Sequence, residues 1–564
     1  MNSTNSQYIE NSVDIERRDS TAEATYSISK IHVSSLHFAM ILSGFFVILF
    51  NKSFFGSAWS VFEIHSVSSF LFSISLIPVL WLITLFFIYL ICIPVIAKPL
   101  SIALLVGGAF SAYFMDTYGV VIDKEMLRNT LETDSHESLG LFSTKLIAYV
   151  FILGLLPSWM VLKVRIIWNN PWSEIVKRLL TLTVVLLASL MIVLSLSSFY
   201  SSFFRNHKEV RFLANPLGFT NAAISLANEA KKTTLVVEPI SQDARLGMGT
   251  LKQSKPVLVV MVVGETARAA NFGVDGYERN TTPLLSKKDI IYFNKFSSCG
   301  TSTAVSLPCI FSTLSRKEYK DTTARSRHGL MDFIQVAGVD VLWRENNSGC
   351  KGVCDRVPHE TFKQEASTQW CKEGNCYDEV LLHELDRKVS GKPQIIVLHQ
   401  NGSHGPAYDQ RYPESMRFYT PVCQTNQLQN CTREEVVNAY DNTIRYTDHF
   451  LTKVVEWLQE QQKTHNVAMM YVSDHGESLG ENRIYLHGMP YAIAPEFQTR
   501  VPFVFWASSG FYHDRGLAKE CLSALSNNAF SHDNIFHSVL GLVDIQTKYY
   551  QPELDIFYSC IDRG

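Results

Sequence analysis

Three short apolar runs in the second half of the chain are each followed at once by residues that can bind a metal ion. The runs are VLVVMVV, QIIVL and VAMMYV, and they lead into GET from Gly264, HQNGSHG from His399 and SDHGE from Ser473. Runs of this length, rich in β-branched residues, are typical of strands that are buried on both faces of a sheet. Because ligands of open α/β sheets sit beyond the carboxyl ends of the strands, we expect these polar residues to converge.

Glu265, Asp474 and His475 would offer two oxygen ligands and one nitrogen ligand. This set suits Zn²⁺, and Mn²⁺ less well, and it leaves a fourth coordination position open, as catalytic zinc requires. Taken singly, each residue is more often a surface acid or a hydrogen-bonded histidine. Their shared position at strand ends favours a metal site.

A segment of small residues, CGTSTAVSLPC from Cys299 to Cys309, could supply the fourth group. It has the pattern of a turn that feeds a helix, where a hydroxyl ordinarily caps the first backbone N–H groups. The functional alternative is a nucleophile, because zinc lowers the pKa of a bound hydroxyl and a helix N-terminus suits a phosphoryl group. From the residues alone, the candidates are not ranked: Thr301, Ser302, Thr303 and Ser306.

The elements that must position these residues have the pattern of an α/β domain. A fourth apolar run spans Val501–Trp506, and Thr432–Gln462 has apolar residues at helical spacing. Strands that alternate with helices predict a mainly parallel sheet between helices. We assign this domain to residues 256–564.

The first 200 residues have a different composition and predict a transmembrane region over residues 33–200. The chain has 564 residues, of which 47% are hydrophobic, and a formal net charge of −3, which gives no indication of a nucleic-acid partner. Most of the apolar segments approach the ~20 residues that cross a bilayer. Five helices are expected, the first of them short: Leu36–Phe50, Phe70–Ile96, Ile102–Val121, Leu146–Val164 and Leu179–Tyr200.

The flanking segments indicate how this region is oriented. Residues 1–32 are polar and lack the pattern of a cleaved signal peptide, so a cytoplasmic tail is expected. Lys and Arg are enriched in this tail and in the loop before the fifth segment, which favours an N-in, C-out orientation. Residues 201–255 are interpreted as a linker with interfacial helices, although plain surface helices would fit equally well.

Ten of the 11 cysteines follow position 298. Their even number and close pairing indicate disulfides, and hence an oxidising compartment, which agrees with a C-terminal domain outside the cytoplasm. A structural zinc site of four cysteines is the alternative. It is disfavoured because no pair shows the two-residue gap of a zinc knuckle.

Five motifs in order resemble the phosphoethanolamine transferases that modify lipid A, which include the mobilised colistin-resistance enzymes of the alkaline-phosphatase and sulfatase superfamily. They are VVGETARAANFGVDGYERNTTP from Val262, CGTSTAVSLPCIFS from Cys299, WRENNSGCKGVCD from Trp343, LHQNGSHGP from Leu398 and YVSDHGESLGENRIYLHGMP from Tyr471. Five apolar segments before one soluble domain are also the layout of this family.

The resemblance implies a role for each matching residue. Thr303 would be the nucleophile, and Glu265, Thr303, Asp474 and His475 would hold Zn²⁺. His404 and His487 would lie near the transferred group, where a second zinc is sometimes bound, and either is a candidate acid for the leaving group. The residues implied to line the head-group pocket are Asn347, Lys351 and Glu477. The disulfides implied are Cys299–Cys309, Cys350–Cys354 and Cys423–Cys431; proximity adds Cys371–Cys376, and Cys521–Cys560 is what remains.

The activity implied is ping-pong transfer of phosphoethanolamine from phosphatidylethanolamine to lipid A through a threonine intermediate. The expected protein is a monomer in the bacterial inner membrane with a periplasmic catalytic domain, and it would confer polymyxin resistance. Alternatives are a membrane phosphodiesterase or phosphatase of the same superfamily, a transferase for core sugars or another periplasmic acceptor, and a non-catalytic scaffold or transporter. A sulfatase is disfavoured because it needs a modifiable Cys or Ser.

Overall fold

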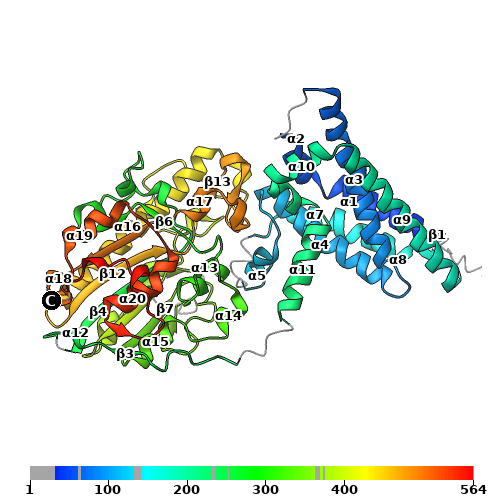
Figure 1. Ribbon diagram of the computed structural model, residues 1–564. Helices are drawn as coiled ribbons and strands as arrows, with labels where there is room; N and C mark the ends of the chain where they lie inside the picture. The colour runs from blue at the N-terminus through cyan, green and yellow to red at the C-terminus, as the bar shows by residue number, and fades with distance from the viewer. Residues whose placement is uncertain are drawn as a thin grey trace, which may run out of the picture.

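The computed structural model describes residues 32–562 except 61–64, 133–140, 231–235, 252, 363–368 and 373–374. The chain forms a helical bundle, coloured blue to cyan-green in Figure 1, and an α/β domain that carries the C-terminus. The predicted cytoplasmic tail lies outside the described residues, apart from His32.

The bundle contains four described helical segments that are long and apolar enough to cross a membrane: α3 (Val67–Ile91), α4 (Ala97–Tyr118), the continuous run Thr144–Lys163, and α9 (Pro171–Ser195). The run Thr144–Lys163 comprises α7 (Thr144–Tyr149), the π-helical η1 (Val150–Leu155) and α8 (Leu156–Lys163). A fifth span exists only if α1 (Ser35–Leu49) and α2 (Lys52–Ser60), which meet at an angle of 53°, count as one. The predicted count of five therefore stands as four to five.

Helix α9 begins eight residues before the apolar run that predicted it. Asn170 accepts a hydrogen bond from Ser173 N, and Pro171 follows in the first turn. An Asn cap followed by Pro is a strong helix start, so this local signal determines the beginning of the helix.

The segment between the bundle and the α/β domain contains α10 (Ser197–Asn206), the 3₁₀ turn η2 (Lys208–Leu213) and α11 (Leu217–Ala230). The α/β domain begins before residue 256, however. Ile240 and Ala244 belong to its core, and β3 (Arg245–Leu246) pairs with β17 (Ile545–Gln546).

A seven-stranded sheet forms the centre of the α/β domain, in the order β5-β15-β12-β4-β11-β7-β8. Only β15 runs antiparallel to its neighbours, so the sheet is mainly parallel. The strands are β4 (Val257–Gly264), β5 (Ile291–Phe293), β7 (Asp340–Glu345), β8 (His359–Thr361), β11 (Gln394–His399), β12 (Asn466–Ser473) and β15 (Phe503–Ala507).

Side chains of β4 alternate between two cores, one on each face of the sheet. Helix α16 (Arg433–Gln461), capped by Thr432, covers one face, in agreement with the predicted helix. The other face is covered by α13 (Thr303–Ile310), α15 (Leu330–Val336), α18 (Ser509–Arg515) and α20 (Ile535–Leu542). Because both faces are buried, the strands are apolar throughout and their polar residues gather at the ends.

The domain contains five disulfides, with the pairing given above: Cys299–Cys309, Cys350–Cys354, Cys371–Cys376, Cys423–Cys431 and Cys521–Cys560. The remaining cysteine, Cys92, is a buried thiol in the bundle.

Candidate active site

The carboxyl ends of β4 and β12 bring Glu265, Asp474 and His475 together. These strands are parallel neighbours, with Ser473 opposite Gly264, so the residues that follow them emerge side by side. All three side chains are buried, and one ligand atom from each lies within 4.8 Å of the other two. Thr303, the first residue of α13, lies against the same group.

The four side chains have the spacing of metal ligands. Thr303 Oγ1 is 3.0 Å from Glu265 Oε2 and 3.3 Å from His475 Nε2. His475 Nε2 is 3.3 Å from Asp474 Oδ2 and 3.5 Å from Glu265 Oε1. Tetrahedral ligands about 2.0–2.1 Å from zinc lie roughly 3.3 Å apart.

Hydrogen bonds around the group leave its metal-facing atoms available. Asp474 Oδ1 accepts from Thr266 N and His475 N, whereas no hydrogen-bond donor among the described residues reaches the buried Oδ2. His475 Nδ1 lies 3.0 Å from Gly476 O and would donate to it, which directs Nε2 to the site. A divalent cation therefore fits these residues.

The electrostatics also favour a cation. Burial, and then the charge of Glu265, raise the pKa of Asp474 above its usual range. Burial would raise the pKa of Glu265 as well, but the surrounding imidazoles, His475 foremost, lower it. Two ionised carboxylates that are both buried need a positive charge between them.

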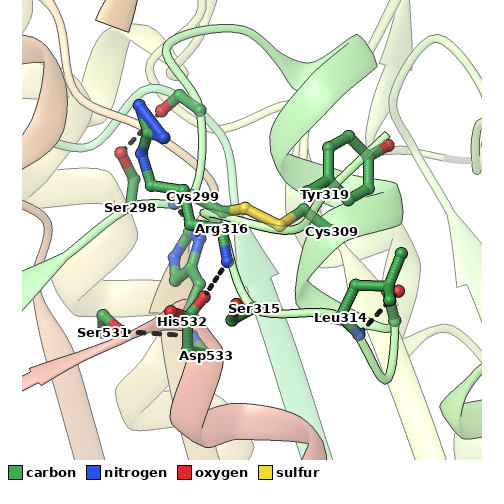
Figure 2. The surroundings of a disulfide bond; sticks show 12 residues. Ser298, Cys299, Cys309, Leu314, Ser315, Arg316, Tyr319, Ser531, His532 and Asp533 are labelled. Carbon is green, nitrogen blue, oxygen red and sulfur yellow. Dashed lines mark hydrogen bonds between the residues drawn. A yellow bond between two sulfur atoms is a disulfide. The ribbon is translucent and has the colours of Figure 1, made fainter. Parts of the chain in front are cut away.

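Among the four hydroxyls that the sequence left unranked, only Thr303 contacts the carboxylate. Thr301 Oγ1 donates to Met489 O, Ser302 is the N-cap of α13, and Ser306 Oγ is buried without a hydrogen-bond partner among the described residues. The Cys299–Cys309 disulfide joins the loop before Thr303 to the end of α13 (Figure 2). This cross-link limits how far Thr303 can move from Glu265.

Asn347 completes the wall behind Glu265. Its Nδ2 donates to Glu265 Oε2 over 2.7 Å and to Gln400 O over 2.9 Å. Glu345 and His399 hold Asn347 in turn: Glu345 Oε1 accepts from Asn347 N, and Glu345 Oε2 lies 2.9 Å from His399 Nδ1. His399 is one of the strand-end residues predicted above; Glu345 was missed, although it ends β7 in the same way as His399 ends β11.

His487 and Glu477 lie on the other side of the site. His487 Nδ1 is 2.8 Å from Glu477 Oε2, and Tyr408 OH donates to Glu477 Oε1. The His487 ring centroid is 4.4 Å from that of His475 and 5.3 Å from that of His404. Burial raises the pKa of Glu477 to about 8.

Lys351, which was expected to line the head-group pocket, contacts a neighbouring loop residue and a helix outside the α/β domain. Its Nζ donates to Ser348 O, to Ser348 Oγ and to the carbonyl of Glu132 in α5 (Lys124–Glu132). Lys351 therefore links the active-site side of the α/β domain to a helix that follows α4.

A cavity of about 700 Å³ lies beside the loop that precedes Thr303, between the two parts of the molecule. Thr301 and Gly488 line it from the α/β domain, and Lys124 and Glu229, in α5 and α11, line it from the other side. Residues of α5 and α11 therefore line the same cavity as Thr301, which is two residues before Thr303.

Comparisons with known proteins match both parts of the chain. The family model "Phosphoethanolamine transferase EptA/EptB" matches residues 80–230, and the model "Sulfatase" matches residues 258–545. Phosphoethanolamine transferase EptA of Escherichia coli K12 is 37% identical over 92% of this chain and 96% of its own length. Phosphatidylethanolamine transferase Mcr-1 of E. coli is 41% identical over 80% of this chain and 84% of its own. The solved integral membrane lipooligosaccharide phosphoethanolamine transferase A of Neisseria meningitidis is 37% identical, with a TM-score of 0.90, over 94% of this chain and 99% of its own.

Proposed function

Since the chain belongs to the phosphoethanolamine transferase family of the alkaline-phosphatase superfamily, we propose that it transfers phosphoethanolamine from phosphatidylethanolamine to lipid A through a Zn²⁺-dependent threonine intermediate. The chain is a phosphoethanolamine transferase of the inner membrane, with several transmembrane helices and a periplasmic C-terminal domain. The donor, the acceptor and the chemistry at Thr303 are the proposed part. The acceptor is supported by relatives named for lipooligosaccharide and for Kdo(2)-lipid A.

The observation that carries the proposal is the 3.0 Å contact between Thr303 Oγ1 and Glu265 Oε2, beside Asp474 and His475. Thr303 Oγ1 lies within hydrogen-bond distance of one carboxylate and one imidazole of the candidate metal site. These four residues would hold Zn²⁺, which when bound stabilises the ionised form of a hydroxyl and negative charge on phosphoryl oxygens.

In the first half-reaction, Thr303 Oγ1 releases its proton to solvent and attacks the phosphorus of phosphatidylethanolamine. A bond forms between Oγ1 and phosphorus, and the bond from phosphorus to the glyceride oxygen breaks. The departing diacylglycerol oxygen takes a proton, for which His404 and His487 are the candidate donors. The Tyr408–Glu477 hydrogen bond fixes the carboxylate that faces His487 Nδ1, and this carboxylate in turn orients the His487 ring.

In the second half-reaction, an oxygen of the acceptor attacks the same phosphorus. The Thr303 Oγ1–phosphorus bond breaks, and phosphoethanolamine remains on the acceptor. The threonine oxygen takes a proton from the acceptor oxygen or from solvent, and solvent reprotonates the histidine that acted in the first step. Asn347 keeps Glu265 in place in both steps through the 2.7 Å hydrogen bond. A phosphate of lipid A that gains an ethanolamine amine is less anionic, which weakens its attraction for cationic polymyxins.

The test is mass spectrometry of lipid A from a Gram-negative host that lacks its own phosphoethanolamine transferases. Cells that express the wild-type chain should contain lipid A with added phosphoethanolamine, Thr303→Ala cells should not, and Thr303→Ser cells should retain part of the modification. Immunoblots must show equal amounts of the three proteins in the inner membrane. Unmodified lipid A with the wild-type chain, or modification that persists in Thr303→Ala cells, would refute the proposal, and free phosphoethanolamine alone would indicate a hydrolase.

A further inference from the structure

His532, a buried histidine that is not one of the four proposed ligands, connects the loop before Thr303 to the end of β12, just before Asp474. His532 is 1% exposed and follows β16 (Ala529–Ser531), which pairs in parallel with β6 (Lys295–Ser297). Because the two short strands run side by side, the residues that follow them, His532 and Cys299, also lie side by side (Figure 2).

The imidazole makes one hydrogen bond at each nitrogen. Cys299 N donates to His532 Nδ1 over 2.9 Å, and His532 Nε2 lies 3.0 Å from Ser473 O. A backbone N–H needs an acceptor and a carbonyl needs a donor, so the proton of the neutral ring is on Nε2. Burial lowers the pKa of His532 to about 3, in agreement with a neutral ring.

Each partner leads directly to a residue of the active site. The carbonyl of Ser473 belongs to the peptide bond before Asp474, and the N–H of that same peptide donates to Gly264 O, just before Glu265. Cys299 is four residues before Thr303 and is tied by its disulfide to the end of α13. One ring thus joins the backbone that carries the nucleophile to the backbone that carries two carboxylates.

We propose that His532 is a positioning residue, which holds Thr303 at its short distance from Glu265 and His475 by fixing the Cys299 and Ser473 peptides. Both of its hydrogen bonds go to backbone atoms, so it acts through those peptides. The effect of His532 on the transfer rate rests on the proposed function. Its effect on the geometry of the metal site can be measured without substrate.

The test compares His532→Ala, His532→Asn and His532→Gln in the full-length chain, purified in detergent. An Asn amide can replace Nδ1 as the acceptor for Cys299 N, a Gln amide can replace Nε2 as the donor to Ser473 O, and Ala removes both links. The matched control is His537→Ala, because His537 is also buried in the same domain and its Nδ1 also accepts a hydrogen bond from a backbone N–H, that of Gln551.

Two measurements at pH 7.5 separate positioning from general stability. For phosphoethanolamine transfer, we expect kcat of His532→Ala to fall on the order of tenfold to a hundredfold at nearly unchanged KM, with partial recovery in the Asn or Gln variant. In Co²⁺-loaded protein, the d–d absorption bands should shift in His532→Ala and not in His537→Ala. Melting temperatures measure the fold of each variant.

A folded His532→Ala protein with wild-type kcat and wild-type Co²⁺ bands would overturn the inference. So would equal losses of kcat in the His532→Ala and His537→Ala proteins. If His532→Ala does not fold, the Asn and Gln variants provide the same comparison. A wild-type chain without transferase activity would refute the proposed function, whereas the Co²⁺ spectra would still test the role of His532.

Discussion

The side-chain amide of Asn347 donates a hydrogen bond to Glu265 Oε2 over 2.7 Å, inside a site where both residues are buried. A donor behind a metal-binding carboxylate orients it, and loss of such a partner typically lowers metal affinity or activity about 10–100-fold. We therefore expect Asn347→Ala to lower zinc affinity, measured by competition with a chelating dye, and transferase activity within this range.

The control for Asn347 is Asn438→Ala in α16. Asn438 is equally buried and donates to Pro421 O, far along the chain from the ligands, so its loss affects stability alone. Zinc affinity that falls equally in both variants would contradict a direct role for Asn347.

Metal removal should abolish activity and lower the melting temperature together. Glu265 and Asp474 are both fully buried, so a bound cation offsets their repulsion, and a ligand at 1,000 times its Kd adds about 4 kcal/mol to the free energy of unfolding. Dialysis against a chelator, followed by calorimetry and a transfer assay, checks this. Zn²⁺ should restore both properties, and Mg²⁺ should not, because it prefers six oxygen ligands.

The connection between α5 and the neighbouring helices depends on Arg128. It is 5% exposed and pairs with Glu229 of α11 over 2.7 Å, and with Glu125. Removing one partner of a buried pair costs about 3–5 kcal/mol. We expect Arg128→Ala to lower the free energy of unfolding by an amount near the lower end of this range, because the glutamates are partly exposed.

A surface pair provides the comparison for Arg128. Lys288 and Glu456 are 3.1 Å apart but solvent-exposed in part, so Lys288→Ala should cost less than about 1 kcal/mol. Equal denaturant midpoints for the two variants would show that the Arg128 network does not stabilise the docked helices.

Much of the α/β domain could be predicted because strands buried on both faces are continuously apolar. The runs before Glu265, His399 and Asp474 proved to be β4, β11 and β12, and the helix after Thr432 begins at its capping box. The beginning of the domain was placed too late, because Ile240 and Ala244 join the core from a segment without a periodic pattern. The bend between α1 and α2 likewise has no hydropathy signal.

The candidate site likewise contains residues that the sequence predicts and residues that it does not. Convergence of Glu265, Asp474 and His475 follows from strand order, whereas the choice of Thr303 among four hydroxyls needed either the family resemblance or the coordinates. His532 follows a three-residue strand and has no sequence signal, because its importance depends on β16 lying beside β6. Contacts between such short elements depend on the tertiary fold and not on local pattern.

Buried neutral histidines should make the protein less stable in mild acid. Burial lowers the pKa of His537 to about 4, so the folded state stays unprotonated where the unfolded chain, with a pKa near 6.5, takes up a proton. The neutral His537 side chain therefore contributes its full share to the free energy of unfolding above pH ~6.5. This contribution is lost as the pH falls toward the pKa of His537 in the folded protein. By linkage, the loss at pH 5 is about 2 kcal/mol.

His537→Gln should remove this contribution, because Gln does not titrate and its amide oxygen can still accept the hydrogen bond from Gln551 N. The free energy of unfolding, measured by denaturant titration at pH 7.5 and pH 5, should therefore fall less steeply with pH in the variant than in the wild type. The variant will be less stable at pH 7.5 if the amide packs poorly, but this offset does not change the slope. An unchanged slope would mean that the pKa of His537 is the same in the folded protein as in the unfolded chain, in conflict with its burial against Phe536.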